Sequence, residues 1–155
     1  MKQTPGEQQL EIRFRPGQIT KSGFMGDDTR HIHDIIEADG KVLERFGLKK
    51  ADIADRLTLF MDEGKKELEG KVDLGEYVVQ VHWARGLMPC PFGEPGLHPK
   101  VVVHVFSKAS RQEIRYSQLS VHMIRKHGFW GGKGSVFRLE PIDVIRLLKM
   151  GGNGE

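Results

Sequence analysis

Two segments rich in β-branched residues, YVVQVHW at residues 77–83 and KVVVHVF at residues 100–106, decide the fold class of this 155-residue chain. In the first segment, apolar residues recur at every second position from Tyr77 to Trp83, which is the period of a strand with one buried face. The second segment is almost continuous in valine, which is typical of a central strand. A further strand is expected at residues 113–116.

Helical patterns precede and follow these strands. Apolar residues spaced three and four apart predict one helix at about 27–46 and a second at about 50–68. A short helix is expected at 117–128, between an N-capping serine and a terminating glycine, and a last one at 141–150, which begins with proline. This order predicts an α+β fold in which an N-terminal helix pair packs on a mainly antiparallel sheet, with short C-terminal helices.

Two shorter stretches also show strand patterns. Residues 10–14 alternate apolar and charged side chains, and residues 136–139 form a short apolar run after a glycine-rich loop. No linker or internal repeat divides the chain. We therefore expect one domain spanning residues 1–155, with a helical lobe at about 27–70 and a sheet lobe at about 75–150.

The composition excludes several classes of protein. An apolar fraction of 38% and a charged fraction of 29% are those of an ordinary globular protein. No apolar run approaches the ~20 residues needed to span a bilayer, so no membrane-spanning segment is expected. The single cysteine, Cys90, excludes an intramolecular disulfide, and we expect a reducing compartment, most simply the cytoplasm.

Positive charge is concentrated in the C-terminal half of the chain. The formal net charge is only +3, but residues 85–138 contain nine Lys and Arg against two Glu, a local excess of +7. Clustered cations favour an anionic partner, because they displace counterions from phosphates. The leading expectation is therefore a small binding or regulatory module, not an enzyme, with a basic face for nucleic acid or a protein partner. The residues expected to form this face are Arg111, Arg115, Arg125, Lys126, Phe129, Trp130 and Lys133.

Phe129 and Trp130 belong to a glycine-rich segment, GFWGGKGS at residues 128–135, that allows two interpretations. The favoured one is a flexible corner that folds both rings back onto the core. In the other, the rings are exposed beside Lys126 and Lys133 and form a stacking platform for single-stranded nucleic acid or a peptide.

Five of the seven histidines follow residue 80, in the same half of the chain as the only cysteine. The sequence MPCPFGEPGLHPK at 88–100, followed by two strands and by LSVHMIRKHGF at 119–129, resembles a two-Cys two-His zinc finger. In that family a thiolate pair from a turn and a histidine pair from the following helix close a tetrahedral zinc site. The resemblance implies zinc as a cofactor, with Cys90, His122 and His127 among its ligands.

The segment departs from the zinc-finger pattern in its ligands and in its spacing. Gly93-Glu94-Pro95 stands where the second cysteine would follow, and Cys90 and His122 are 32 residues apart, where the family keeps about a dozen. Two histidines five apart on an ideal helix also point some 140° away from each other, so the last turn would have to tighten or unwind. Three other histidines are candidates for the missing ligand: His98, which enters our predicted set, and His104 and His82.

Two alternatives to a metal site stay open. Cys90 lies between two prolines and would serve as a small apolar filler if His122 and His127 had only packing and capping roles. It would instead be the nucleophile of an enzyme if a histidine acted as its base, which requires a lowered thiol pKa.

Overall fold

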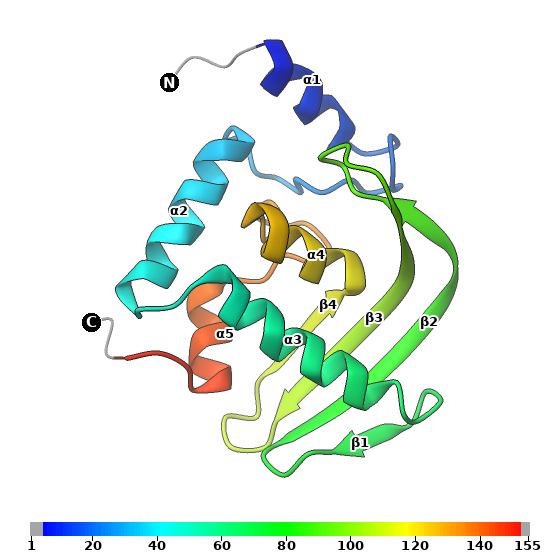
Figure 1. Ribbon diagram of the computed structural model, residues 1–155, viewed down its shortest axis with the longest axis vertical. Coiled ribbons are helices and arrows are strands. Elements are labelled where there is room, and N and C mark those ends of the chain that lie inside the picture. The colour runs from blue at the N-terminus through cyan, green and yellow to red at the C-terminus, as the bar shows by residue number, and fades with distance from the viewer. Residues whose placement is uncertain (1–4, 153–155) are drawn as a thin grey trace.

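The computed structural model describes residues 5–152, and within this range it contains five helices and one four-stranded sheet. The helices lie at both ends of the chain and the sheet lies between them, so the predicted α+β class is confirmed (Figure 1). In chain order the elements are α1 (Pro5–Arg13), α2 (Ile32–Arg45), α3 (Lys50–Gly64), β1 (Lys71–Asp73), β2 (Tyr77–Pro89), β3 (Leu97–Ser107), β4 (Glu113–Ser117), α4 (Gln118–His127) and α5 (Pro141–Leu148).

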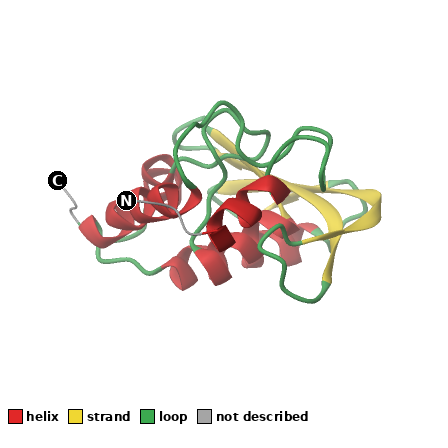
Figure 2. Ribbon diagram, turned by 90° about the horizontal axis from the view of Figure 1, so that it is seen from above, coloured by secondary structure: helices red, strands yellow, loops and turns green. Residues whose placement is uncertain are grey.

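The sheet has the order β1-β2-β3-β4, and all three neighbouring pairs are antiparallel, as predicted. Every second residue is buried along residues 77–81 of β2 and 101–107 of β3, where Val79, Val81, Val103 and Val105 are all 0% exposed. The helices α3 and α4 pack against this face, and Figure 2 shows the helices and the strands as separate layers. At Gly64 a Cβ would lie 2.4 Å from Val81 Cγ2, so the end of α3 needs glycine to approach β2.

The strand β2 is longer than the sequence pattern predicted, and its outer end is irregular. The pairing of β2 with β3 shifts register between Trp83 and Leu87, next to Gly86, which has a φ of +107°. On the other edge, β1 pairs with residues 78–80 only. Residues 81–89 therefore have no neighbouring strand on that edge within the described part of the chain.

Two groups of buried side chains form the core. The larger group joins the valines of the sheet to α3, α4 and α5. The smaller group brings together α1, α2, α4 and the turn between β2 and β3, and its buried members are Phe14, Ile32, Ile35, Cys90, Leu119, Met123 and Phe129. We call this smaller group the second cluster.

The strand predicted at residues 10–14 is wrong, because most of this segment belongs to the helix α1. Pro5 occupies the first helical position, where its missing N–H costs nothing, and the following Glu, Gln and Leu residues are good helix formers. Of the alternating apolar residues only Phe14, just after the helix, is buried, while Ile12 is 38% exposed. The strand predicted at 136–139 is also absent: residues 136–137 form a turn, and no residue of this segment belongs to the described sheet.

Both ends of α4 and the start of α5 follow the sequence predictions, whereas α5 ends at Leu148, two residues before the predicted end. Ser117 caps α4 by accepting a hydrogen bond from the Ser120 amide, and Gly128 ends the helix in the left-handed conformation with φ +67°. Pro141 is the first residue of α5. Among the described helices, none has the length and apolar character needed to cross a membrane.

A buried ion pair ties α2 to the loop between α4 and α5. The guanidinium of Arg138 donates to both carboxylate oxygens of Asp39, at 2.6 and 3.0 Å, and to the Gly131 carbonyl at 2.9 Å. The side chains of Arg138 and Asp39 are only 7% and 6% exposed. The second carboxylate on Arg138 belongs to Glu140, whose side chain is 44% exposed.

Candidate metal centre

The turn between β2 and β3, residues 90–96, lies beside the end of α1 (Figure 1). Arg13 holds this turn in place: its Nε donates to the Pro91 carbonyl at 2.7 Å and its Nη2 to the Phe92 carbonyl at 3.3 Å. Gly93 has a φ of +89° and donates its amide to the Cys90 carbonyl at 3.0 Å. This tight turn places Cys90 and Glu94 on the same side as α4.

The helix α4 supplies two histidines to the same place. The Nε2 atoms of His122 and His127 both contact Oε1 of Glu94, His127 at 2.8 Å and His122 more closely. The 140° separation is accommodated without unwinding, since α4 runs to His127 and only then ends at Gly128. At about 100° per residue around the helix axis, Met123 lies between His122 and His127. The two imidazoles therefore reach the turn from either side of Met123.

Four potential metal-ligating atoms converge at this point. One donor atom from each of Cys90, Glu94, His122 and His127 can be chosen so that all four lie within 4.8 Å of one another. Cys90 is 1% exposed, and the side chains of the other three are between 19% and 30% exposed. A group of one thiol, one carboxyl and two imidazoles at this spacing can hold a metal ion.

The charges of the group are arranged for cation binding. Hydrogen bonds from His127 and His122 lower the pKa of Glu94 to about 2, so its carboxylate is ionised at neutral pH. Burial, together with a hydrogen bond to Glu94 and the negative charge of that carboxylate, raises the pKa of Cys90 to about 12. Without a metal, Cys90 is therefore a thiol, and a bound cation would favour its thiolate.

Aromatic rings brace the histidine pair. The ring of Phe92 stacks on that of His127, with centroids 3.9 Å apart and planes at 12°. Phe92 in turn contacts the edges of Phe14 and Phe129, which belong to the second cluster. The orientation of His127 is thus coupled to the packing of the second cluster, to which Cys90 also belongs.

Three of the four predicted ligands, Cys90, His122 and His127, lie in this group, whereas His98 does not. The ring of His98 packs against that of His122, with centroids 4.3 Å apart, and is not one of the four converging residues. The other two candidates, His82 and His104, pack against each other on the strands β2 and β3. His104 contacts Glu113 there and takes no part in the group.

Glu94 is the fourth member of the group, and sequence reasoning missed it as a candidate ligand. It lies four residues after Cys90, where a zinc finger would have its second cysteine. The spacing C-x-x-x-E was the available signal, since carboxylates also bind zinc. Glu94 can join the group only because of the tight turn at Gly93, which brings Glu94 back toward Cys90.

The residues predicted to form a basic face lie on several elements. Arg125 pairs with Asp55 at 2.6 Å, and the guanidinium of Arg115 lies 5.5 Å from the ring centre of Phe137. Three further cations, Arg111, Lys126 and Lys133, are exposed. Binding of nucleic acid or a protein by these cations stays a prediction.

Phe129 and Trp130 do not contribute an exposed stacking surface. They are 0% and 2% exposed, so the interpretation in which the glycine-rich corner folds both rings onto the core is confirmed. The two rings belong to different parts of the interior: Phe129 to the second cluster and Trp130 to the larger one. Comparison of the chain with known protein families, with curated proteins and with solved structures finds no match.

Proposed function

We propose that this protein is a metal-stabilised domain that binds one zinc ion through Cys90, Glu94, His122 and His127. The observation that carries this proposal is the convergence of four ligand atoms of suitable chemistry within 4.8 Å. One sulfur, two imidazole nitrogens and one carboxylate oxygen form a mixed set that suits zinc, whereas Mg²⁺ and Ca²⁺ prefer oxygen alone.

The proposed role of the ion is structural. Four protein ligands complete a tetrahedral zinc site and leave no position for a substrate, whereas catalytic zinc sites keep one position open. The ligands come from the turn between β2 and β3 and from α4, so the ion would fasten that turn to the helix above the second cluster. The raised pKa of Cys90 also favours this role over that of a nucleophile, which requires a thiolate.

Metal content and thermal melting of the untagged protein test this proposal. We expect about one zinc per chain and a melting temperature that falls on addition of a chelator and recovers with Zn²⁺. Cys90→Ser, Glu94→Gln and His122→Ala should each lower the zinc content, because each removes a ligand. His104→Ala is the matched control, since His104 also contacts a glutamate but lies outside the group.

The size of the expected stabilisation follows from mass action. A site that is saturated at about 1,000 times its dissociation constant stabilises the folded state by about 4 kcal/mol. In a chain of this length that corresponds to a shift of roughly 8 to 16 °C in melting temperature. A protein that contains no metal, and whose melting is unaffected by chelator or added zinc, would contradict the proposal.

A further inference from the structure

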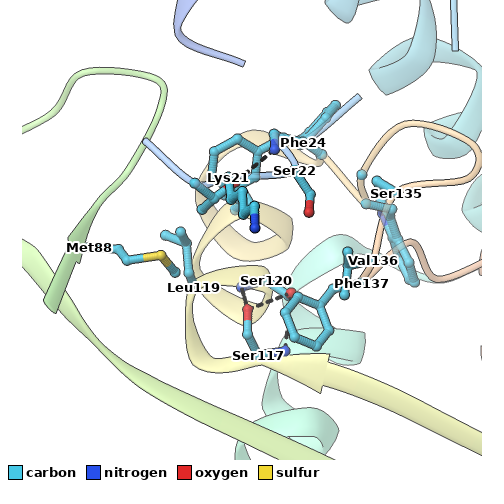
Figure 3. A pocket seen from close by; sticks show the side chains of 16 residues that line it. Lys21, Ser22, Phe24, Met88, Ser117, Leu119, Ser120, Ser135, Val136 and Phe137 are labelled. Atoms are coloured by element: carbon cyan, nitrogen blue, oxygen red, sulfur yellow. Dashed lines mark hydrogen bonds between the residues drawn. The ribbon is translucent and has the colours of Figure 1, made fainter. Parts of the chain in front are cut away.

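A pocket of about 220 Å³ with mostly apolar walls lies beside α4. It lies between the start of α4, the segment at residues 20–24 and the loop that follows α4 (Figure 3). Most of its wall is apolar, including Phe24, Met88, Leu119 and Phe137. None of the four proposed zinc ligands lines it, so the pocket and the candidate metal centre have no ligand residue in common.

The polar groups of the pocket favour an anion. Lys21 is the only charged residue among those that line the pocket, and none of them is acidic. Figure 3 shows Lys21 and Ser22 on the side of the pocket opposite Ser117 and Ser120, at the start of α4. Lys21 makes no ion pair or hydrogen bond with any residue between 5 and 152, so its ammonium group is available to a ligand.

The start of α4 adds to the positive potential that Lys21 provides. The first amides of a helix have no partner within the helix, and the helix dipole places partial positive charge at this end. Ser117 and Ser120 already satisfy each other through a reciprocal cap, with Ser120 N to Ser117 Oγ at 3.0 Å. The helix end is therefore preorganised, and a negative charge nearby is favoured.

One residue of the pocket wall, Trp130, has a buried donor without a partner. Trp130 lines the pocket and is 2% exposed, and its Nε1 has no hydrogen-bond partner among the described residues. Buried donors in proteins are nearly always paired. An unpaired buried donor in a residue of the pocket wall supports a ligand that carries a polar group.

From the cavity, its single cation and its apolar wall, we infer that this protein binds a small monocarboxylate with an apolar body. An apolar cavity of about 150 Å³ holds benzene, so a pocket of about 220 Å³ holds a ligand of roughly nine non-hydrogen atoms. Benzoate has this size. The apolar body fills the space between Met88, Leu119 and Phe137, and the carboxylate faces Lys21 and the start of α4.

Intrinsic fluorescence provides a direct assay, because Trp130 lines the pocket. The other tryptophan, Trp83, is 40% exposed on β2 and is not part of the pocket wall. Trp83→Phe therefore leaves Trp130 as the only indole. Titration of this variant with benzoate should give a saturable change in emission, with a dissociation constant of about 1 mM or tighter.

Two comparisons test the chemistry of the site. Benzyl alcohol has a similar shape without the charge and should bind about tenfold more weakly. Lys21→Met should weaken benzoate by a similar factor and leave benzyl alcohol unchanged. Lys133→Met is the matched control, since Lys133 is also exposed but does not line the pocket, and it should change neither affinity.

Three results would overturn the inference. They are the absence of saturable benzoate binding, equal affinities for benzoate and benzyl alcohol, and equal effects of the two lysine substitutions. Zinc content measured on the same samples separates this test from that of the metal centre. Protein that contains no zinc but binds benzoate contradicts only the metal proposal. Protein that contains zinc but does not bind benzoate contradicts only the proposed carboxylate site.

Discussion

Removal of Arg138 should destabilise the protein far more than removal of Arg125, although both form an ion pair with a 2.6 Å contact to an aspartate. The two pairs differ in burial. The side chains of Arg138 and Asp39 are 7% and 6% exposed, whereas those of Arg125 and Asp55 are 38% and 69% exposed. Comparison of the two substitutions therefore separates the effect of burial from that of distance.

The loss of folding stability depends on the groups that each substitution leaves without a partner. Arg138→Met leaves the buried carboxylate of Asp39 without its two hydrogen bonds, and breaking a buried pair in this way costs about 3–5 kcal/mol. Arg125→Met leaves Asp55 in water and should cost about 0–1 kcal/mol. At roughly 2–4 °C per kcal/mol for a chain of this length, Arg138→Met should lower the melting temperature by about 6–20 °C.

Urea denaturation of the two variants and of the double variant Asp39→Leu/Arg138→Met measures these differences. The double variant replaces both buried partners by apolar side chains, so no unpaired carboxylate is left in the interior and part of the lost stability should return. The reasoning is refuted if Arg138→Met costs no more than Arg125→Met, or if the double variant is less stable than Arg138→Met alone.

Three further predictions concern the candidate metal centre and buried contacts elsewhere in the fold. In metal-free protein the pKa of Glu94 is lowered, so the stability that this residue contributes is present above its ordinary pKa of 4.5 and is lost as the pH falls toward about 2. In urea denaturation across this range, the stability advantage of wild type over Glu94→Gln should therefore shrink with acidification. A difference that stays constant with pH would contradict this pKa assignment. Gly132→Ala should destabilise the protein by about 1–3 kcal/mol in thermal melts, because a Cβ there would lie 2.1 Å from the Met25 carbonyl oxygen, and an unchanged melting temperature would show that the loop has room to move. Tyr116→Phe removes the buried hydrogen bond to the Leu57 carbonyl at 2.7 Å and should cost about 1–3 kcal/mol in urea denaturation, whereas a neutral effect would mean that this carbonyl finds another donor.

The sheet was predictable because its strands bury a single face. The alternation of Tyr77, Val79 and Val81 and the valines of 100–106 record that burial directly in the sequence, whereas Trp83, the next residue in the alternation, is 40% exposed. The alternation at residues 10–14 has the same appearance but a different origin. Its only buried member is Phe14, and none of the strands in residues 5–152 pairs with this segment, so local helix propensity determines its structure.

The candidate metal centre could be predicted only in part. Cys90, His122 and His127 were found because a thiol and a helical histidine pair are residue types with a known ligand pattern. Glu94 was missed because its position depends on the backbone conformation of Gly93 and on the contacts that Arg13, 78 residues from Pro91, makes with the turn. The spacing of residues along the chain gives no information about such long-range contacts.

The irregular outer end of β2 has a consequence for self-association. Residues 81–89 present an unpaired strand edge, and such edges invite strands from other molecules. This edge carries three features that oppose such pairing: the charge of Arg85, the register shift at Gly86, and Pro89, which has no amide hydrogen to donate. The longest strand of the protein thus lies partly at the margin of the sheet, yet it is a poor template for edge-to-edge aggregation.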